Sequence, residues 1–507
     1  MNVLLINGHP RKDSLTEALV HAYAEGARTA GVHLETLVLT DLTFDPNVTY
    51  FTPSKQLFEP DIERAQELIL WADHVVFIYP TWWGTMPALL KGFIDRVFTA
   101  GFAFDDIDGG TGYAPLLSGK SAQIITTMDT PLWVYRWVYR SPGHNAMRRA
   151  ILQFCGFEMA RTQSFGPVKS STEHERNRWL QQVKNEGLRL KNGSLSSWTR
   201  FTIKTWSWLK AVRLQFYPMT FIAYATGAFA AENSGYSFKT SIFWLGYLWL
   251  FLVELATVLT NDYLDFKSDK QNNYFSAFTG GSRVIVDKLL SFSEIKKGIF
   301  VTLFASVVIL ALLLLNTPRS LPTMLLTCAM IFVLALGYTV PPLKLSYRGL
   351  GELTVGLTHS FAAVVCGYLF QGGKMEDPFP WLLSLPMFFA VLPSIILSGI
   401  PDFHADKAAS KKTLAVRFGK KGAAVLALGF TLTAAITVVI FKLHQILPDT
   451  FGNLFIVAIP HATLLSILLW RYIKNPDPLP RIDTLMIASL TYLIWFGLFP
   501  LIHLWSS

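Results

Sequence analysis

The pattern of apolar and polar positions divides the chain into two parts. Up to about residue 190, short apolar runs alternate with segments of helical period, whereas beyond about residue 210 the apolar runs are long. The short runs predict strands at residues 2–6, 33–39, 74–79, 121–127 and 158–165, with helices at 15–30, 62–70, 86–98, 145–154 and 173–190. Short strands separated by helices are typical of an α/β doubly wound parallel sheet. Such sheets bind ligands at the carboxyl ends of their strands, so the loops after Ile6, Tyr79 and Thr127 are expected to form a site.

The second part predicts an all-α membrane domain of nine transmembrane helices. Each apolar segment is close to the ~20 residues that span a bilayer core. The segments cover residues 215–232, 240–262, 296–316, 320–340, 350–371, 379–400, 421–442, 452–472 and 483–504. A polar stretch, 192–197, and a Trp-rich amphipathic segment separate the two parts. The expected domains are therefore residues 1–190 and 211–507, joined by a linker and interfacial segment at 191–210.

Composition and charge fit a membrane protein with an attached soluble domain. The chain is 51% hydrophobic with a mean hydropathy of +0.36 and a net charge of +9. The basic residues concentrate in alternate loops between the apolar segments, which the positive-inside rule explains better than nucleic-acid binding. This asymmetry predicts an inner-membrane protein with its N-terminal domain on the cytoplasmic side, and the first residues show no signal peptide. Cys155, Cys328 and Cys366 lie far apart, which predicts neither a disulfide framework nor a zinc site.

Two acidic clusters lie beside the membrane-length segments. Ionisable side chains in such surroundings are costly and indicate function. At helical spacing, each cluster places its carboxylates on one face, and five of them are too many to be only helix caps. Facing each other, the two clusters would form an anionic pocket for two or more Mg²⁺ ions and a diphosphate. The expected metal ligands, which are also the expected catalytic residues, are Asp262, Asp265, Asp269, Asp402 and Asp406.

Neutral and basic residues near these clusters are candidates for substrate binding. Asn261 is the neutral neighbour of the first cluster. Basic side chains can bind a diphosphate directly, although a basic residue in such a loop can also serve only to anchor it at the membrane surface. The candidates for direct contact are Arg283, Lys344, Arg348 and Lys411.

Two loops of the first part carry a second candidate site. The loop at residues 8–16 opens a helix, and backbone amides at a helix N-terminus with nearby hydroxyls can hold a phosphate. An ordinary helix start capped by Asp13 or Ser14 is the alternative interpretation. The loop at residues 79–87 contains Trp82 and Trp83, and two indoles after a buried strand indicate a flat aromatic ligand.

The stretches GHPRKDSLT, YPTWWGTMPALLKGFIDRVFTAGFAF and ILQFCGFEMARTQSFG resemble the flavodoxin-like NAD(P)H:quinone reductases. The resemblance implies FAD or FMN, NAD(P)H as reductant and a quinone as acceptor, and reductases of this fold often form homodimers. It assigns the flavin to His9, Ser14, Leu15, Thr16, Pro80, Thr81, Trp82, Trp83 and Gly84. Tyr135, Tyr139 and His144 are candidates for contact with the quinone, with packing as the alternative. The chain departs from the family at Thr16 and at Met128-Asp129.

The motifs NDYLDFKSD, FTGGSRVI, YTVPPLKLSYRGLGE and DFHADKAASKKTLAVRFG resemble the UbiA superfamily of intramembrane prenyltransferases. FTGGSRVI and the second acidic motif are most similar to the menaquinone-pathway branch, although Ser398 and Pro401 depart from it. The resemblance implies a polyprenyl diphosphate donor and an aromatic acceptor.

Together the two halves predict a bifunctional enzyme. NAD(P)H would reduce a naphthoquinone-like acceptor through a flavin, and the membrane domain would prenylate the resulting quinol. The reverse order, in which the finished prenylquinone is reduced, is also consistent with these motifs. The alternative is a prenyltransferase for another aromatic acceptor whose flavoprotein domain senses redox state and regulates it.

Overall fold

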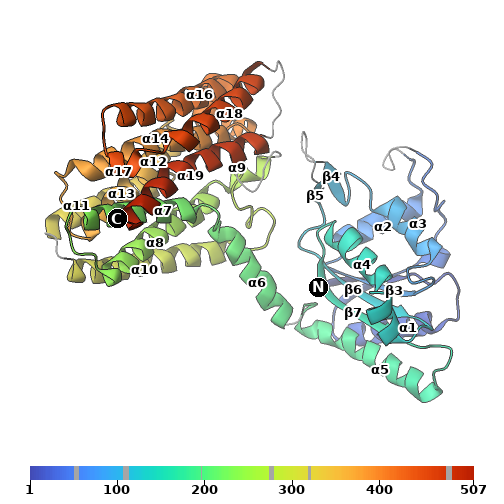
Figure 1. The fold of residues 1–507 in the computed structure, drawn as a ribbon. Helices are drawn as coiled ribbons and strands as arrows, with labels where there is room; N and C mark the ends of the chain where they lie inside the picture. Colours follow the sequence, from blue (N-terminus) through green and yellow to red (C-terminus); the bar gives the residue numbers. More distant parts are fainter. Residues whose placement is uncertain are drawn as a thin grey trace. The chain divides into compact units, whose positions relative to one another are not determined.

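The computed structural model describes residues 1–50, 56–106, 113–195, 197–272, 279–317, 321–474 and 482–506 (Figure 1). They form two compact units that divide within helix α6 (Ser197–Val212). The first unit is a parallel sheet with helices on both faces, and the second is helical.

The sheet of the first unit has the strand order β2-β1-β3-β6-β7, and all its pairings are parallel. The strands are β1 (Asn2–Asn7), β2 (His33–Val38), β3 (His74–Pro80), β6 (Ser121–Thr127) and β7 (Glu158–Phe165). This confirms the predicted doubly wound fold. The order reverses between β1 and β3, so their carboxyl ends form the expected ligand crevice.

Helices cover both faces of this sheet. One apolar core packs under α1 (Leu15–Thr29) and α5 (Glu173–Arg189), and another packs under α2 (Pro60–Trp71) and α3 (Ala88–Val97). A small antiparallel pair, β4 (Phe104–Asp106) with β5 (Tyr113–Pro115), was not predicted. The segment after β6 contains a π-helical turn (Val134–Val138), α4 (Pro142–Asn145) and a π-helix (Ala146–Gln153) where the sequence predicts one helix.

The second unit is helical, as predicted, but nine transmembrane helices are not confirmed. Within the described residues, seven helices are long and apolar enough to cross a membrane. They are α8 (Thr240–Leu264), α10 (Phe292–Asn316), α12 to α13 (Gly351–Phe370), α14 (Pro378–Ser398), α16 (Leu414–Leu443), α18 (Phe455–Lys474) and α19 (Asp483–Ser506). The other two predicted spans correspond to α7 (Tyr217–Asn233) and α11 (Leu321–Gly337), which have 17 residues each. A span normally needs about 20 residues.

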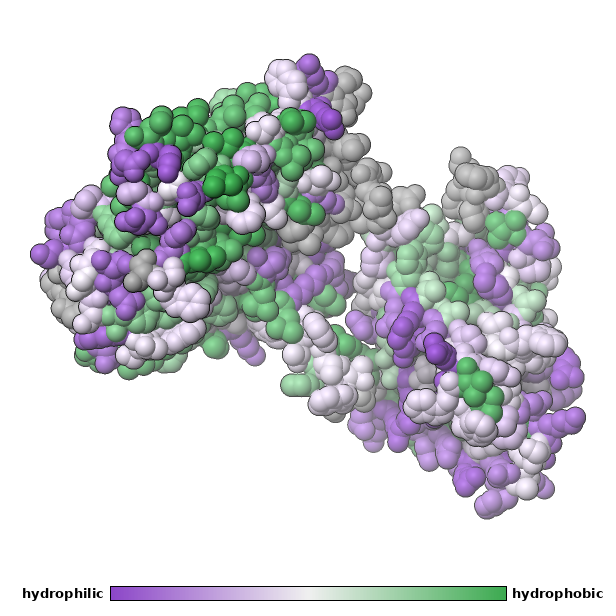
Figure 2. Space-filling view, in the orientation of Figure 1, coloured by the Kyte–Doolittle hydropathy of each residue, from purple (hydrophilic) through white to green (hydrophobic). Residues whose placement is uncertain are grey.

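Small residues allow helices of this unit to approach closely. A Cβ at Gly227 of α7 would lie 1.9 Å from the carbonyl oxygen of Val364, and one at Gly367 of α13 would lie 2.0 Å from that of Tyr224. Such contacts replace the hydrophobic effect as a source of helix association in a lipid environment. The outer surface of the unit carries many hydrophobic residues (Figure 2).

Both acidic motifs lie at helix ends in this unit. The first runs from the last turn of α8 through Asp265 into the short helix α9 (Phe266–Gln271). The second begins at Asp402, directly before the short helix α15 (Phe403–Ala408) that follows α14. Helices α9 and α15 pack against each other, so motifs 130 residues or more apart in sequence become neighbours. Cys155, Cys328 and Cys366 are buried free thiols.

Candidate active site

A cavity of about 370 Å³ lies among the helices of the membrane unit, and both acidic motifs reach it. Its wall includes Asn261, Asp265, Asp269, Asp402 and Asp406. Asp262 lies just behind the wall, where the backbone N–H of Ser282 donates to Asp262 Oδ1 over 3.1 Å and the Ser282 hydroxyl donates to Oδ2. The structure therefore brings the predicted carboxylates into one region, with four lining the cavity and the fifth supporting it.

The polar partners of the carboxylates come from distant parts of the chain. Lys411 Nζ lies 2.7 Å from Asp265 Oδ2, and the Tyr347 hydroxyl donates to Asp265 Oδ1 over 2.7 Å. Asn272 Nδ2 donates to Asp402 Oδ1, also over 2.7 Å. Lys411 is 3.5 Å from Asp406 as well. A single buried lysine thus faces two carboxylates.

The carboxylates outside the spanning helices have unusually high proton affinity. Burial, followed by the negative charge of Asp262, raises the pKa of Asp269 to about 7. Burial and the charge of Asp406 raise the pKa of Asp402 to about 7. Burial therefore disfavours the ionised form of both carboxyls, and a cation bound beside them would favour that form.

The donor set suits a magnesium ion. Carboxylate and amide oxygens are the ligands that Mg²⁺ prefers, and Mg²⁺ is commonly held by one or two carboxylates with waters and substrate phosphates completing its shell. In the described part of the chain, no three acidic, histidine or cysteine side chains surround one point. Carboxylates that do not by themselves enclose one point fit a metal whose shell is completed by a phosphate ligand.

The four predicted diphosphate contacts separate into two groups. Lys411 lines the cavity. The Arg283 guanidinium donates to the carbonyl oxygen of Asp269 over 2.8 Å, which ties Arg283 to α9. Lys344 lies over the ring of Tyr347, 5.0 Å from its centroid, and Arg348 donates to the carbonyl oxygen of Pro342 over 2.8 Å. Arg283, Lys344 and Arg348 are not part of the cavity wall.

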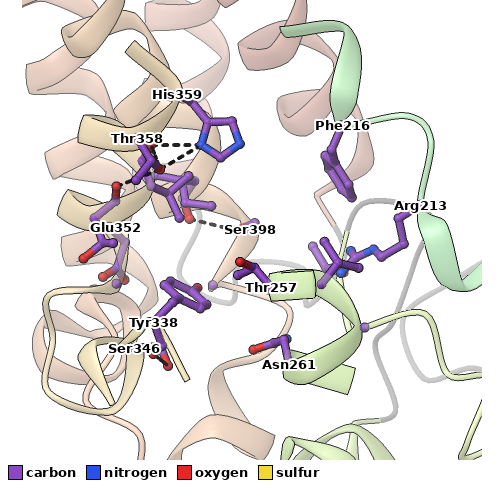
Figure 3. A pocket seen from close by; sticks show the side chains of 18 of the residues that line it. Arg213, Phe216, Thr257, Asn261, Tyr338, Ser346, Glu352, Thr358, His359 and Ser398 are labelled. Atoms are coloured by element: carbon purple, nitrogen blue, oxygen red, sulfur yellow. Dashed lines mark hydrogen bonds between the residues drawn. The ribbon is translucent and has the colours of Figure 1, made fainter. Parts of the chain in front are cut away.

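The sequence did not point to several groups that line the cavity or bind its carboxylates. Arg213, which directly follows α6, lines the cavity, and Figure 3 shows it on the same side as Phe216. Tyr347 and Asn272 bind the carboxylates, although both occur in or next to recognised motifs. A side chain that can donate a hydrogen bond, in or next to an acidic or basic motif, could have been predicted to bind one of the carboxylates. Arg213 had no comparable signal, because a basic residue before an apolar segment is usually an interfacial anchor.

Beyond the carboxylates the cavity is largely apolar. Its wall there includes Phe216, Val253 and Tyr338, together with the polar residues Thr257 and His359 (Figure 3). Such a lining suits a flat hydrophobic ring or the first part of a lipid chain.

In the first unit, the loop after β1 is held by its own side chains. Asn7 Oδ1 accepts from the backbone N–H of His9, and His9 Nδ1 accepts from that of Arg11 over 2.9 Å. Burial lowers the pKa of His9. Ser14 caps α1 by accepting from the N–H of Glu17 over 3.2 Å. Ser14 is therefore the N-cap of α1, as in the alternative interpretation of this loop. A phosphate would bind at the same end of the helix.

The loop after β3 forms a tight turn at the same edge. Paired hydrogen bonds between Trp82 and Thr85 close it, and the N–H of Thr81 donates to the carbonyl oxygen of Thr127 over 2.7 Å. Trp83 has a positive φ of 51° and its side chain is fully exposed. Thr81 Oγ1 is buried without a hydrogen-bond partner among the described residues. An unpaired hydroxyl beside a turn in the ligand crevice fits a bound polar heterocycle such as a flavin.

The other assigned flavin residues lie at the start of α1. Leu15 is its first residue, and Thr16 Oγ1 is 3.4 Å from Thr127 Oγ1. The ring of His9 meets Trp82 edge-on, with centroids 5.9 Å apart. The three loops predicted from the strand ends thus contact one another at the carboxyl edge of the sheet.

The three candidates for quinone contact differ in exposure. Tyr135 is buried, and its hydroxyl donates to the carbonyl oxygen of Gly84 while accepting from the N–H groups of Gly143 and His144. His144 Nε2 is 3.0 Å from Thr126 Oγ1, and burial lowers the pKa of this histidine to about 4. Tyr139 is exposed. In this structure the Tyr135 hydroxyl stabilises the turn at Gly84. This is the packing role that the sequence analysis gave as the alternative to quinone contact.

Comparison with known proteins covers both units. Residues 1–186 match the family with a flavodoxin-like fold, and residues 220–497 match the UbiA prenyltransferase family. An uncharacterised NAD(P)H oxidoreductase of Haemophilus influenzae is 28% identical over 174 residues, which are 33% of this chain and 85% of that protein. The ribosyldihydronicotinamide dehydrogenase (quinone) of Rattus norvegicus is 27% identical over 215 residues, or 36% of this chain and 90% of the rat protein.

Among solved structures, an NAD(P)H:quinone oxidoreductase from Methanothermobacter marburgensis is 23% identical, with a TM-score of 0.33, and the match covers 38% of this chain and 96% of that one. The UbiA match extends over more than half of the chain. The chain therefore belongs to the UbiA prenyltransferase family, and its first unit is a flavodoxin-like domain of the NAD(P)H:quinone oxidoreductase type.

Proposed function

We propose that this protein reduces a naphthoquinone-like acceptor to its quinol and transfers a polyprenyl group to the quinol ring, as in the synthesis of a menaquinone-type lipid. The observation that carries the proposal is the joining of two acidic motifs at one cavity, in a chain that also has a quinone-reductase-type domain. From the distribution of basic residues among the loops, we also propose that both sites lie on the cytoplasmic side of an inner membrane.

For the transfer step, the aspartates would hold Mg²⁺ at the acidic end of the cavity. Asp265, Asp269, Asp402 and Asp406 lie on the wall, and Asp262 supports them. Bound Mg²⁺ would supply positive charge to the diphosphate and make it a better leaving group. Lys411 and Arg213 would bind diphosphate oxygens, because both line the same region. The apolar inner wall would exclude water from the allylic cation.

For the reduction step, the crevice between β1 and β3 would bind the flavin. The Thr81 hydroxyl, which has no hydrogen-bond partner among the described residues, would donate a hydrogen bond to the flavin. The N-terminus of α1 would bind the flavin phosphate. A flavin supplies hydride transfer between NAD(P)H and a quinone. FMN and FAD share the isoalloxazine ring and the phosphate that these contacts would bind.

The chemistry of the acceptor explains why the two domains occur in one chain. A quinone ring is electron-poor and reacts slowly with a carbocation, whereas its hydroquinone is electron-rich. A tethered reductase would supply the quinol at an effective concentration on the mM scale if the linker allows both sites to be reached.

The test is to incubate purified full-length protein with menadione, geranylgeranyl diphosphate and Mg²⁺, with and without NADPH, and to measure prenylated naphthoquinol by mass spectrometry. We expect product only with NADPH. Absence of product in both conditions would contradict prenylation of this acceptor. Equal product without a reductant would contradict the coupling and favour a regulatory flavoprotein domain.

The order of the two reactions needs a separate measurement. Prenylated menadione, supplied in its oxidised form with NADPH, reports whether the reductase accepts the finished product. We expect menadione to be reduced faster than its prenylated form. The opposite preference would place reduction after prenyl transfer.

A further inference from the structure

The inner part of the cavity contains a second pair of ionisable groups. Glu254 is on α8, and His359 is on the π-helical turn Thr358–Ala362. Glu254 Oε1 lies 3.5 Å from His359 Nε2, and both side chains line the cavity. Ionisable groups inside membrane-spanning helices are costly to maintain, so a pair that faces a cavity indicates a function there.

The pair leaves one basic oxygen unused. His359 Nδ1 lies 3.1 Å from the carbonyl oxygen of Val355 and 3.1 Å from Thr358 Oγ1. When Nδ1 donates to that carbonyl oxygen, Nε2 faces Glu254 and shares a proton with Oε1. Glu254 Oε2 is buried and has no hydrogen-bond partner among the described residues. Glu254 lines the largely apolar cavity, and a carboxylate with one oxygen unpaired is well suited there to accept a proton or bind a hydroxyl group.

The pair and the aspartates occupy different levels of the cavity. Two turns of α8, roughly 10 Å, separate Glu254 from Asn261. Thr257 lies between these two levels, and Figure 3 shows His359 and Asn261 at opposite ends of the view. A flat ring in the apolar middle would therefore have the diphosphate site on one side and Glu254 on the other.

We infer that Glu254 is the proton acceptor of the prenyl-transfer site and that His359 positions it. This inference rests on the proposed transfer of a prenyl group to an aromatic quinol. When the allylic C–O bond breaks, its electron pair leaves with the diphosphate. A ring carbon then supplies the electron pair of the new C–C bond, and the ring becomes a cation that still carries its hydrogen.

The same step ends with loss of that hydrogen. The C–H bond breaks, its electrons return to the ring, and the proton goes to the Glu254 carboxylate. The positive charge thereby moves from the ring to the Glu254–His359 pair, and the products are the prenylated quinol and diphosphate. The proton then passes to water after the products have left. This assigns the acceptor ring to the apolar middle of the cavity.

A purely structural pair would have different consequences. In that case Glu254 and His359 would only join α8 to the turn at residues 358–362, and their replacement would lower stability and every kinetic parameter together. A proton acceptor instead affects one bond, the C–H bond at the reacting carbon. An isotope effect at that carbon distinguishes these two roles.

The experiment uses full-length protein, geranylgeranyl diphosphate, Mg²⁺ and chemically reduced menadione that carries either hydrogen or deuterium at C3. Glu254→Gln keeps the shape of the side chain and removes its basicity. We expect kcat to fall by about 100-fold, the usual contribution of general base catalysis. The deuterium isotope effect on kcat should rise well above the wild-type value, and KM for the prenyl diphosphate should stay unchanged.

Matched controls test loss of polar contacts elsewhere in the unit. Asp377→Asn weakens hydrogen bonds from the hydroxyls of Tyr236 and Tyr368 outside the cavity. His461→Gln alters a histidine of α18 that accepts a hydrogen bond from the indole N–H of Trp495 on α19. We expect neither control to change the isotope effect.

His359→Gln is the second test variant, on a different segment from Glu254, so failure of one variant to fold leaves the other. It should lower kcat less than Glu254→Gln while raising the isotope effect in the same direction. Wild-type kinetics in both folded variants, or slow kinetics with a wild-type isotope effect, would overturn the inference. No product from the wild-type protein would overturn the proposed transfer itself, and the inference with it.

Discussion

In the membrane unit the candidate site consists of side chains, whereas in the flavodoxin-like unit it consists largely of backbone. Asp265 and Asp402 present carboxylates to the cavity, and Lys411 lies beside them. The crevice of the sheet is formed by tight loops, in which Tyr135 and the turn at residues 82–85 hold one another. The comparison indicates that the two sites should respond differently to mutation. Isosteric changes should abolish activity in the first, and changes in loop shape should matter most in the second.

The largest expected effect is from Asp402→Asn. This variant keeps the size of the side chain and removes one charge from the cluster. Prenyl transfer should fall by about 10³-fold, as when one preorganised electrostatic group is removed from an active site. NADPH-dependent menadione reduction should be unchanged in the same preparation. Loss of both activities would show that the sites are not separable, and Asp377→Asn is the matched control.

A second prediction concerns acid stability of the first unit. Burial lowers the pKa of His74 to about 4, whereas the unfolded value is near 6.5. Above pH 6.5 the histidine is neutral in both states; as the pH falls, the unfolded chain binds the proton first. This should cost about 2 kcal/mol of stability between pH 7 and 5. The melting temperature, measured as a function of pH, should fall less steeply in His74→Gln than in the wild-type protein. His21 is exposed, so His21→Gln should keep the wild-type dependence.

The backbone character of the flavin crevice can be tested at Gly143. A Cβ there would lie 2.6 Å from the carbonyl oxygen of Gly84 and 2.8 Å from Thr85 Cα. Gly143→Ala should therefore displace the turn at a cost of about 1–3 kcal/mol. We expect weaker flavin retention and slower menadione reduction with normal prenyl transfer to pre-reduced menadione. Arg149→Ala, an exposed change on the neighbouring π-helix, is the control, and unchanged flavin content in Gly143→Ala would contradict this role of the loop.

The smallest effect is expected from Tyr135→Phe. The substitution removes the hydroxyl that donates to the carbonyl oxygen of Gly84, at a cost of about 1 kcal/mol. The melting temperature measured by flavin release should fall slightly, and KM for menadione should change little. A large rise in KM alone would instead identify Tyr135 as a quinone contact.

Much of the architecture was predictable because it depends on local patterns. All five strands of the parallel sheet were predicted to within a residue or two, since short apolar runs between helices have few alternatives. The acidic motifs were recognisable because charge beside an apolar span is costly. The nine-span count was not confirmed, because α7 and α11 fall below normal spanning length.

The partners within the site could not be predicted in the same way. Tyr347 reaches Asp265 across 82 residues, and Glu254 meets His359 across 105 residues of sequence. No local pattern encodes such pairings, since they depend on how the helices pack. The same applies to Arg283, whose contact with the carbonyl oxygen of Asp269 makes it a support of the loop.

The burial of the three cysteines has a further consequence for an enzyme that handles quinones. Quinones are electrophiles that add irreversibly to thiolates, and thiolate reactivity requires both ionisation and access. Cys155, Cys328 and Cys366 are all buried, and burial raises the pKa of Cys155 to about 12. None of the three presents a reactive sulfur to a passing quinone. The fold therefore protects the protein from alkylation by the compound class that we propose as its substrate.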